Sequence, residues 1–211
     1  MTSCAMATIL ADRALAVVRA PEIPDPVALA NALAKSGIRT VELTFTTPRL
    51  LDHLKTAATS EAVLGAGTVL TADQARSAVD AGAEFLVTPG IRVDVAEVAT
   101  HRGIPVIMGA LTPTEVLVAL DLGAAAVKIF PAGVFGPGYF KDLRGPFPDV
   151  ALIPSGGVNA GNAADFLARG AVAVSAGTDV VPPQAVISGN WSEIESRAAS
   201  FVQSLNRKAF L

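Results

Sequence analysis

Lys128 is the one charged residue in the stretch AAVKIFPA, residues 125–132. Burial disfavours the ammonium form, so a lysine between Val127 and Ile129 reaches water, pairs with an acid, or is partly neutral and nucleophilic. A neutral amine can attack a ketone to form an imine, and a carboxylate such as Glu42 can move the protons that the following steps require. The alternative is a structural ion pair between the same two residues.

The elements that would position Lys128 follow a regular rhythm of short apolar, β-branched runs. Eight such runs predict strands, at residues 15–19, 40–44, 62–67, 84–88, 104–108, 125–130, 150–155 and 171–175. They are continuous rather than alternating, as expected for strands covered on both faces. The segments between them have apolar residues at helical spacing, with Asp, Thr or Asn at the start and Gly at the end, for example 71–82 and 112–123.

This pattern predicts one parallel α/β domain over residues 1–211, folded as a (β/α)8 TIM barrel. The closed barrel is favoured over an open sheet because there are eight strands and no G-x-G-x-x-G motif after the first. Residues 2–13 predict an extra N-terminal helix, which we place across the bottom of the barrel.

Polar and glycine residues gather at the carboxyl ends of the predicted strands, where TIM barrels carry their chemistry. Alternation along the sixth strand makes Lys128 and Phe130 point the same way, into the barrel mouth if Val127 and Ile129 pack against helices. The other candidates at this rim are Arg19, Glu42, Thr68, Thr88, Pro89, Ser155, Gly156, Gly157, Gly177 and Thr178.

Two glycine loops, PSGGVNAGN after the seventh strand and AGT after the eighth, lie where many barrels bind phosphate. Taken singly, a Gly-Gly pair is more often a tight turn, but two such loops in this order indicate a phosphate site. Arg19 at the end of the first strand is either a surface residue or a bidentate clamp for a carboxylate. Thr68 and Thr88 could be ordinary turn residues, and they are candidates only because they lie at the same rim as these residues.

Composition excludes several classes of function. The net charge is −3, and the 16 basic residues form no basic stripe, so we expect no nucleic-acid or membrane partner, only a small-molecule substrate. A single cysteine and the lack of a signal-like start lead us to expect a cytoplasmic protein. His53 and His101 have no metal-ligand spacing, and we expect neither a metal nor a cofactor.

Several motifs together resemble those of the 2-keto-3-deoxy-6-phosphogluconate (KDPG) aldolase and 4-hydroxy-2-oxoglutarate (KHG) aldolase family. In chain order they are VVRA, GIRTVELTFTTP, GAGTVLTADQARSAVDAGAEFLVTPG, LTPTE, VKIFPA, GPFPDVALIPSGGV and SAGT. The resemblance implies a class I pyruvate aldolase on a (β/α)8 barrel, a homotrimer that cleaves KDPG to pyruvate and glyceraldehyde 3-phosphate.

By their motif positions, Lys128 resembles the imine-forming lysine and Glu42 the general acid/base. Arg19 would hold the carboxylate of the pyruvyl part and Thr68 would contact it. The residues that would bind the phosphate are Ser155, Gly156, Gly157, Gly177 and Thr178.

The sequence departs from the family pattern at two positions. Thr46 stands where many members have an arginine, so a cation that contacts substrate is missing. Met108-Gly109 replaces the usual Pro-Gly, which we expect to alter the rim. The alternatives are KHG cleavage by the same lysine, a phosphate-binding epimerase or isomerase, and a trimeric assembly module that has lost its activity; a metal-dependent epimerase would need strand-end His and Asp ligands, which are not found there.

Overall fold

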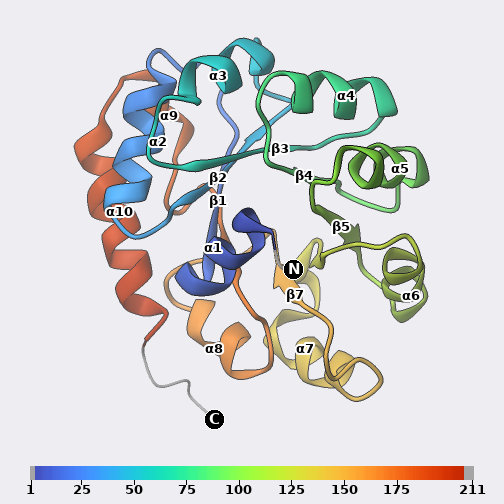
Figure 1. Cartoon of the computed structure of the whole chain (residues 1–211). Helices are drawn as coiled ribbons and strands as arrows, with labels where there is room; N and C mark the ends of the chain where they lie inside the picture. Colours follow the sequence, from blue (N-terminus) through green and yellow to red (C-terminus); the bar gives the residue numbers. More distant parts are fainter. Residues whose placement is uncertain (1–2, 207–211) are drawn as a thin grey trace.

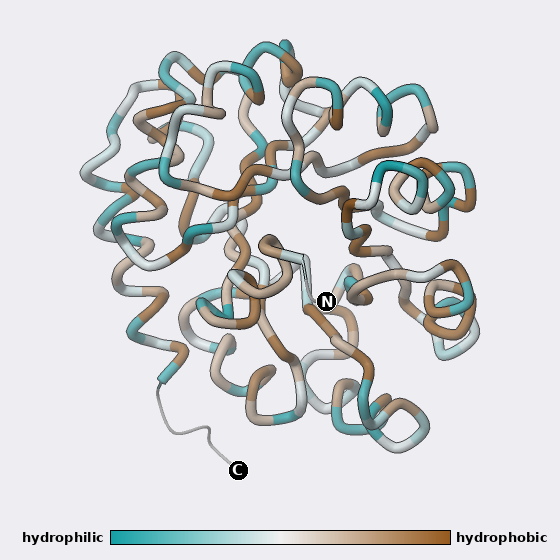
Figure 2. Tube along the Cα trace, in the orientation of Figure 1, coloured by the Kyte–Doolittle hydropathy of each residue, from teal (hydrophilic) through white to brown (hydrophobic). Residues whose placement is uncertain are grey.

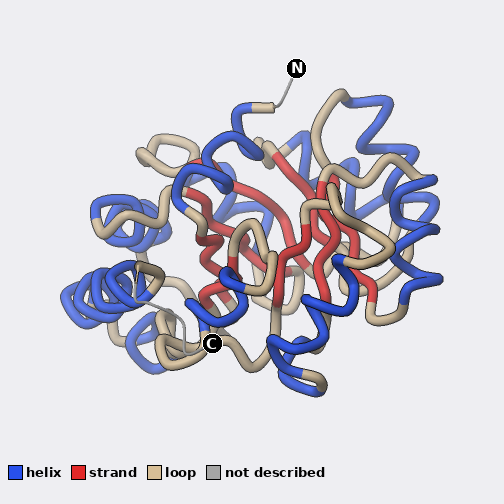
Figure 3. The backbone as a smooth tube through the Cα atoms, turned by 90° about the horizontal axis from the view of Figure 1, so that it is seen from below, coloured by secondary structure: helices blue, strands red, loops and turns tan. Residues whose placement is uncertain are grey.

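Eight parallel strands form a nearly closed barrel in the computed structural model, which describes residues 3–206. The strands pair in the order β7-β6-β5-β4-β3-β2-β1-β8. The N–H of Val172, just before β8, donates to the Leu152 carbonyl of β7 at 3.0 Å. Helices surround the strands (Figure 1, Figure 3). The predicted (β/α)8 barrel is therefore confirmed. The strands are β1 (Ala14–Val18), β2 (Thr40–Thr44), β3 (Val63–Gly67), β4 (Phe85–Val87), β5 (Val106–Ala110), β6 (Ala126–Ile129), β7 (Leu152–Pro154) and β8 (Val174–Ala176).

Helices occupy the connections between strands, precede β1 and follow β8. They are α1 (Cys4–Asp12), α2 (Pro26–Lys35), α3 (Leu50–Ala57), α4 (Ala72–Asp80), α5 (Val93–Arg102), α6 (Pro113–Asp121), the 3-10 turn η1 (Ala132–Val134), α7 (Gly136–Arg144), α8 (Ala163–Ala168), α9 (Pro183–Ile187) and α10 (Trp191–Ser204). Asp25, Thr71 and Thr112 accept hydrogen bonds from the first turns of α2, α4 and α6, as their cap positions predict. No described helix is long and apolar enough to cross a membrane.

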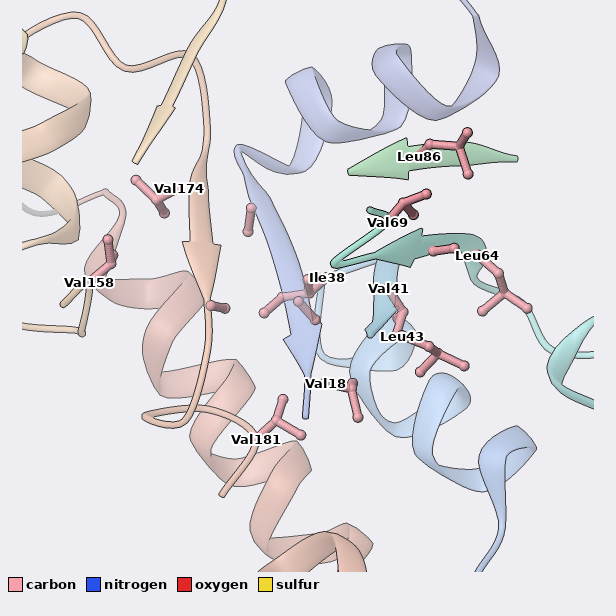
Figure 4. Packing of buried hydrophobic residues seen from close by; sticks show 14 of the residues in the cluster. Val18, Ile38, Val41, Leu43, Leu64, Val69, Leu86, Val158, Val174 and Val181 are labelled. Carbon is pink, nitrogen blue, oxygen red and sulfur yellow. The ribbon is translucent and has the colours of Figure 1, made fainter. Parts of the chain in front are cut away.

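Two apolar layers hold the barrel together. Side chains such as Val41, Leu43 and Leu64 project outward from the strands into the layer beneath the helices (Figure 4). Hydrophobic segments follow the strands, and hydrophilic ones alternate along the helices (Figure 2). Val127 and Ile129 belong to this outer layer, so Lys128 and Phe130 between and after them point inward, as alternation predicts.

The N-terminal helix α1 closes the bottom of the barrel, as expected. Ala5, Met6 and Ile9 of α1 pack against an inner layer that includes Leu15, Phe85, Val87, Ile107, Ala126, Ile153 and Ala173. Figure 1 shows α1 lying across this end of the ring of strands. The backbone N–H of Arg39 donates to the Asp12 carboxylate at the end of α1 at 2.8 Å. The carboxyl ends of the strands lie at the opposite end.

The strand ends differ from the predicted ones by up to three residues. The run at 104–108 was predicted as a strand, but β5 is Val106–Ala110, because Pro105 has no N–H for the ladder and pairing continues through Gly109. Likewise β8 begins at Val174 rather than at residue 171. Apolar runs report burial, whereas hydrogen bonding between neighbours decides where a strand starts.

Candidate active site

A cavity of about 370 Å³ opens at the carboxyl ends of the strands. Ten of the twelve residues predicted from the sequence line it: Arg19, Thr68, Pro89, Lys128, Phe130, Ser155, Gly156, Gly157, Gly177 and Thr178. The other two, Glu42 and Thr88, are fully buried beside it. Val17, Val158 and Ser175 also line the cavity and were not predicted.

Lys128 and Glu42 meet in the interior from opposite sides of the barrel. The Lys128 Nζ lies 3.7 Å from the Glu42 Oε1, and the two residues are 7% and 0% exposed. That separation exceeds a hydrogen bond, and neither carboxylate oxygen of Glu42 has a hydrogen-bond partner within residues 3–206. A carboxylate this poorly satisfied is available to accept a proton from a nearby group.

Gly67 makes the space that the Glu42 carboxylate occupies. A Cβ built on Gly67 would lie 1.8 Å from the Glu42 Oε1, far inside any tolerable contact. Glu42 and Gly67 lie on the neighbouring strands β2 and β3, where Glu42 pairs with Gly65. The glycine of the GAGT motif thus lets the carboxylate reach inward toward Lys128.

Phe130 forms part of the cavity mouth beside the lysine. The Lys128 Nζ lies 5.6 Å from the centre of the Phe130 ring, within the range of a cation–π contact. The ring is 40% exposed, so it separates the lysine from solvent on one side and presents an apolar face to a ligand on the other.

Arg19 and Thr68 supply the polar groups on the β1 and β3 side. Arg19 Nη2 lies 3.4 Å from the Thr68 Oγ1. Thr68 has a left-handed backbone, φ 55°, which for a β-branched residue costs about 1–3 kcal/mol. Strain of this kind is characteristic of sites in which a side chain must be aimed, here toward the guanidinium and the cavity.

The loop after β7 has two consecutive left-handed glycines, Gly156 at φ 81° and Gly157 at φ 83°. A Cβ on Gly157 would lie 2.9 Å from the Gly133 Cα, so both the conformation and the space require glycine. The Gly156 carbonyl accepts from Gly133 N–H at 2.8 Å, and the Gly157 carbonyl accepts from the Asn162 amide at 2.9 Å. The carbonyls are thus turned into the protein.

The backbone N–H groups of both glycine loops remain free to bind an anion. Among the described residues, no acceptor takes the N–H of Gly156, Gly157, Gly177 or Thr178. The loops are tied together, because the Asp179 carboxylate accepts from the Ala160 N–H at 3.0 Å. Adjacent free N–H groups on a fixed loop form a nest for phosphate oxygens.

Thr88 supports the cavity wall from behind. Its hydroxyl donates to the Gly90 carbonyl at 2.7 Å and accepts from the Gly109 N–H at 3.3 Å. The side chain therefore joins the ends of β4 and β5 and fixes Pro89, which does line the cavity.

Comparison with protein families identifies the chain. The model of the family described as "KDPG and KHG aldolase" matches residues 6–197. The chain belongs to this aldolase family. Its members are named as aldolases, which are carbon–carbon lyases, and the resemblance read from the motifs is confirmed.

Individual aldolases match over most of the chain. The 2-dehydro-3-deoxy-phosphogluconate aldolase of Treponema pallidum is 34% identical over 194 residues, 90% of this chain and 92% of the relative. The KHG/KDPG aldolase of Escherichia coli K12 is 33% identical over 190 residues, 89% of each chain. A crystal structure of the KDPG aldolase of Legionella pneumophila, with pyruvate captured as a covalent carbinolamine intermediate, superposes with a TM-score of 0.84. It is 31% identical and covers 92% of this chain and 96% of its own.

The two departures from the aldolase pattern lie in different surroundings. Thr46 is exposed, its hydroxyl lies 2.9 Å from that of Thr44, and it is not among the residues that line the cavity. Met108 was expected to alter the rim, and this was wrong. It is fully buried in the outer apolar layer of the aldolase barrel, because it follows the inward-facing Ile107 and points to the helices.

Ser175 is the polar cavity residue that the sequence analysis missed. It is the only polar residue of the apolar run AVAVS, which is the same signal that singled out Lys128. No group of three or more His, Cys, Asp or Glu residues that could hold a metal occurs in the described part of this aldolase.

Proposed function

We propose that this chain is a class I aldolase that cleaves KDPG to pyruvate and glyceraldehyde 3-phosphate through an imine on Lys128. The observation that carries the proposal is the buried pair of Lys128 and Glu42, 3.7 Å apart, in a cavity that is also lined by the free backbone N–H groups of the loops after β7 and β8. A trapped pyruvate carbinolamine in the Legionella relative supports the same covalent chemistry here.

The reaction uses each member of the pair in turn. The neutral Lys128 amine attacks the ketone carbon to form a carbinolamine. The carbinolamine hydroxyl takes up a proton and leaves as water, which gives a protonated imine; hydrolysis of the imine at the end of the cycle returns that proton. Glu42 takes the proton of the hydroxyl on the carbon two positions from the imine carbon. The bond between that carbon and the carbon next to the imine carbon breaks, and the aldehyde leaves. The electron pair of the broken bond moves into the imine to form an enamine. Protonation of the enamine and hydrolysis release pyruvate and restore Lys128.

The remaining residues hold the two ends of the substrate. We assign the pyruvyl carboxylate to the Arg19 guanidinium, with Thr68, Pro89 and Phe130 around the pyruvyl carbons. Thr88 positions Pro89 rather than touching substrate, because its hydroxyl is already bonded within the protein.

The phosphate lies on the loops after β7 and β8. We assign it to the N–H groups of Gly156, Gly157, Gly177 and Thr178 and to the Ser155 hydroxyl. These loops favour KDPG over KHG as substrate, because KHG has no phosphate to use them. The intact pair of Lys128 and Glu42 favours an active enzyme over an assembly module. Pyruvate release from a panel of phosphorylated and unphosphorylated keto acids tests this choice, and faster release from the unphosphorylated acids would reverse it.

Gly177→Asp is expected to lower kcat/KM for KDPG cleavage by about 10²-fold, near 3 kcal/mol, because its carboxylate repels the phosphate. A Cβ at Gly177 meets nothing within 4 Å, so a side chain fits there, whereas one at Gly157 would meet Gly133 and disturb the loop. Gly177→Asn is the matched control of equal size and should lose much less. Steady-state kinetics on both variants make the comparison, and equal losses would remove the phosphate from this loop.

We also propose a homotrimer, supported by exposed apolar side chains on α6. Leu117, Val118 and Leu120 are 52%, 37% and 36% exposed on this helix. Light scattering should give a mass of about 65 kDa, three times the 21.5 kDa chain. Leu117→Asp should lower that mass, whereas Leu10→Asp, at an exposed leucine of α1, should not. A wild-type mass of one chain would contradict the trimer.

We place the protein in the cytoplasm. The support is its cysteine usage, since Cys4 is the only cysteine of the chain and is an exposed free thiol, as expected in a reducing compartment.

A further inference from the structure

The hydroxyl of Ser175 is buried in the cavity without a partner. Its Oγ is one of three buried side-chain oxygens in the described chain that make no hydrogen bond, and the other two belong to Glu42. Ser175 is 3% exposed and lines the same cavity as Lys128 and Arg19. A buried hydroxyl left unpaired costs free energy, so such a group at a ligand cavity indicates a partner on the ligand.

The position of Ser175 in β8 places it on the cavity floor. Val174 and Ala176 belong to the outer apolar layer, and Ala173 belongs to the inner layer at the bottom of the barrel. Ser175 therefore faces inward, one step above the bottom layer and one step below Gly177 at the rim. Two residues along a strand span about 6–7 Å, so the backbone of Ser175 lies roughly this far below that of Gly177.

We propose that Ser175 binds the substrate hydroxyl on the carbon next to the phosphate-bearing carbon, and so selects the aldehyde. This inference rests on the proposed function. With the ketone carbon on Lys128 and the phosphate at Gly177, the chain between them passes the wall that β8 forms between β1 and β7. Glu42 takes the proton of the hydroxyl at the breaking bond, which leaves the hydroxyl beside the phosphate-bearing carbon without a partner.

A serine suits this task because its hydroxyl both donates and accepts a hydrogen bond. A site that has paired with a substrate hydroxyl also rejects an analogue that lacks it, since the buried protein hydroxyl is then left unpaired again. Ser175 is thus expected to act on the choice of aldehyde rather than on imine formation.

The test compares two aldehydes in the addition of pyruvate. Glyceraldehyde 3-phosphate carries the hydroxyl, and 3-oxopropyl phosphate has the same length and phosphate but lacks it. We expect the wild type to prefer the former by about tenfold or more in kcat/KM. Ser175→Ala should lower kcat/KM for glyceraldehyde 3-phosphate by about tenfold and change that for 3-oxopropyl phosphate by less than about threefold.

Ser175→Cys separates hydrogen bonding from packing, because a thiol is of similar size but a weak donor and acceptor. It should lose the preference as Ser175→Ala does. A cysteine variant that behaves as wild type, equal losses with both aldehydes, or an undiminished preference in the alanine variant would each overturn the inference. The ratio within one preparation is insensitive to the fraction of folded enzyme. Failure of the proposed function would look different, because the wild type would then add pyruvate to neither aldehyde.

Discussion

Borohydride added together with pyruvate is expected to leave a reduced pyruvyl adduct on Lys128. Hydride reduces the imine to a secondary amine, which makes the link between pyruvate and the lysine permanent. Intact mass measurement followed by peptide mapping locates the adduct. An unchanged mass, or an adduct on the exposed Lys141 of α7, would contradict the mechanism.

Lys128→Met should lower KDPG cleavage by about 10³-fold or more, because Lys128 is the only lysine among the described residues that line the cavity. Methionine is one atom shorter than lysine but keeps an unbranched apolar side chain, so the barrel should still fold, which circular dichroism can check. Lys141→Met is the matched control, since this lysine is exposed and lies outside the cavity. Comparable losses in both variants would point to damage of the fold rather than of the reaction.

Glu42→Gln is expected to lower kcat by about 10²-fold or more, because the amide keeps the shape of the carboxylate but cannot accept the proton. Borohydride trapping of pyruvate should persist at a slower rate, since the amine itself is intact. Stopped-time trapping and steady-state cleavage on the same preparation separate the two effects. Turnover at the wild-type rate would reduce Glu42 to the structural ion pair that the sequence also allowed.

The fold was largely predictable because each strand of a parallel barrel is buried on both faces and so appears as a continuous apolar run. The same property hides the direction of each side chain. In the run IPVIM, residues 104–108, every residue is apolar, so Met108 was expected at the rim but faces the helices. Lys128 was not ambiguous in this way. Its apolar neighbours Val127 and Ile129 were expected to pack against the helices, which leaves the charged side chain pointing into the barrel.

The site was predictable where polar types stood at strand ends, and less so where they stood within strands. Ser175 was missed because it is small and lies within a strand, two residues before Gly177 at the rim. Thr88 was predicted to bind substrate, but its neighbours in space, Gly90 and Gly109, occupy its hydroxyl. Gly67 is needed because the Glu42 carboxylate of the neighbouring strand β2 occupies the space beside it. The sequence around Gly67 gives no sign of this contact.

The helix α1 and the inner apolar layer that it covers close the bottom of the barrel, so ligands reach the cavity from the carboxyl ends of the strands. Lys128 lies in the interior, whereas the loops with Gly157 and Thr178 lie toward the exposed end. We therefore expect the two ligands to enter and leave in a fixed order. On the proposed assignment, the aldehyde lies nearer the opening than the pyruvyl part. We therefore expect the aldehyde to leave while pyruvate is still bound to Lys128, and pyruvate to enter first in the reverse direction.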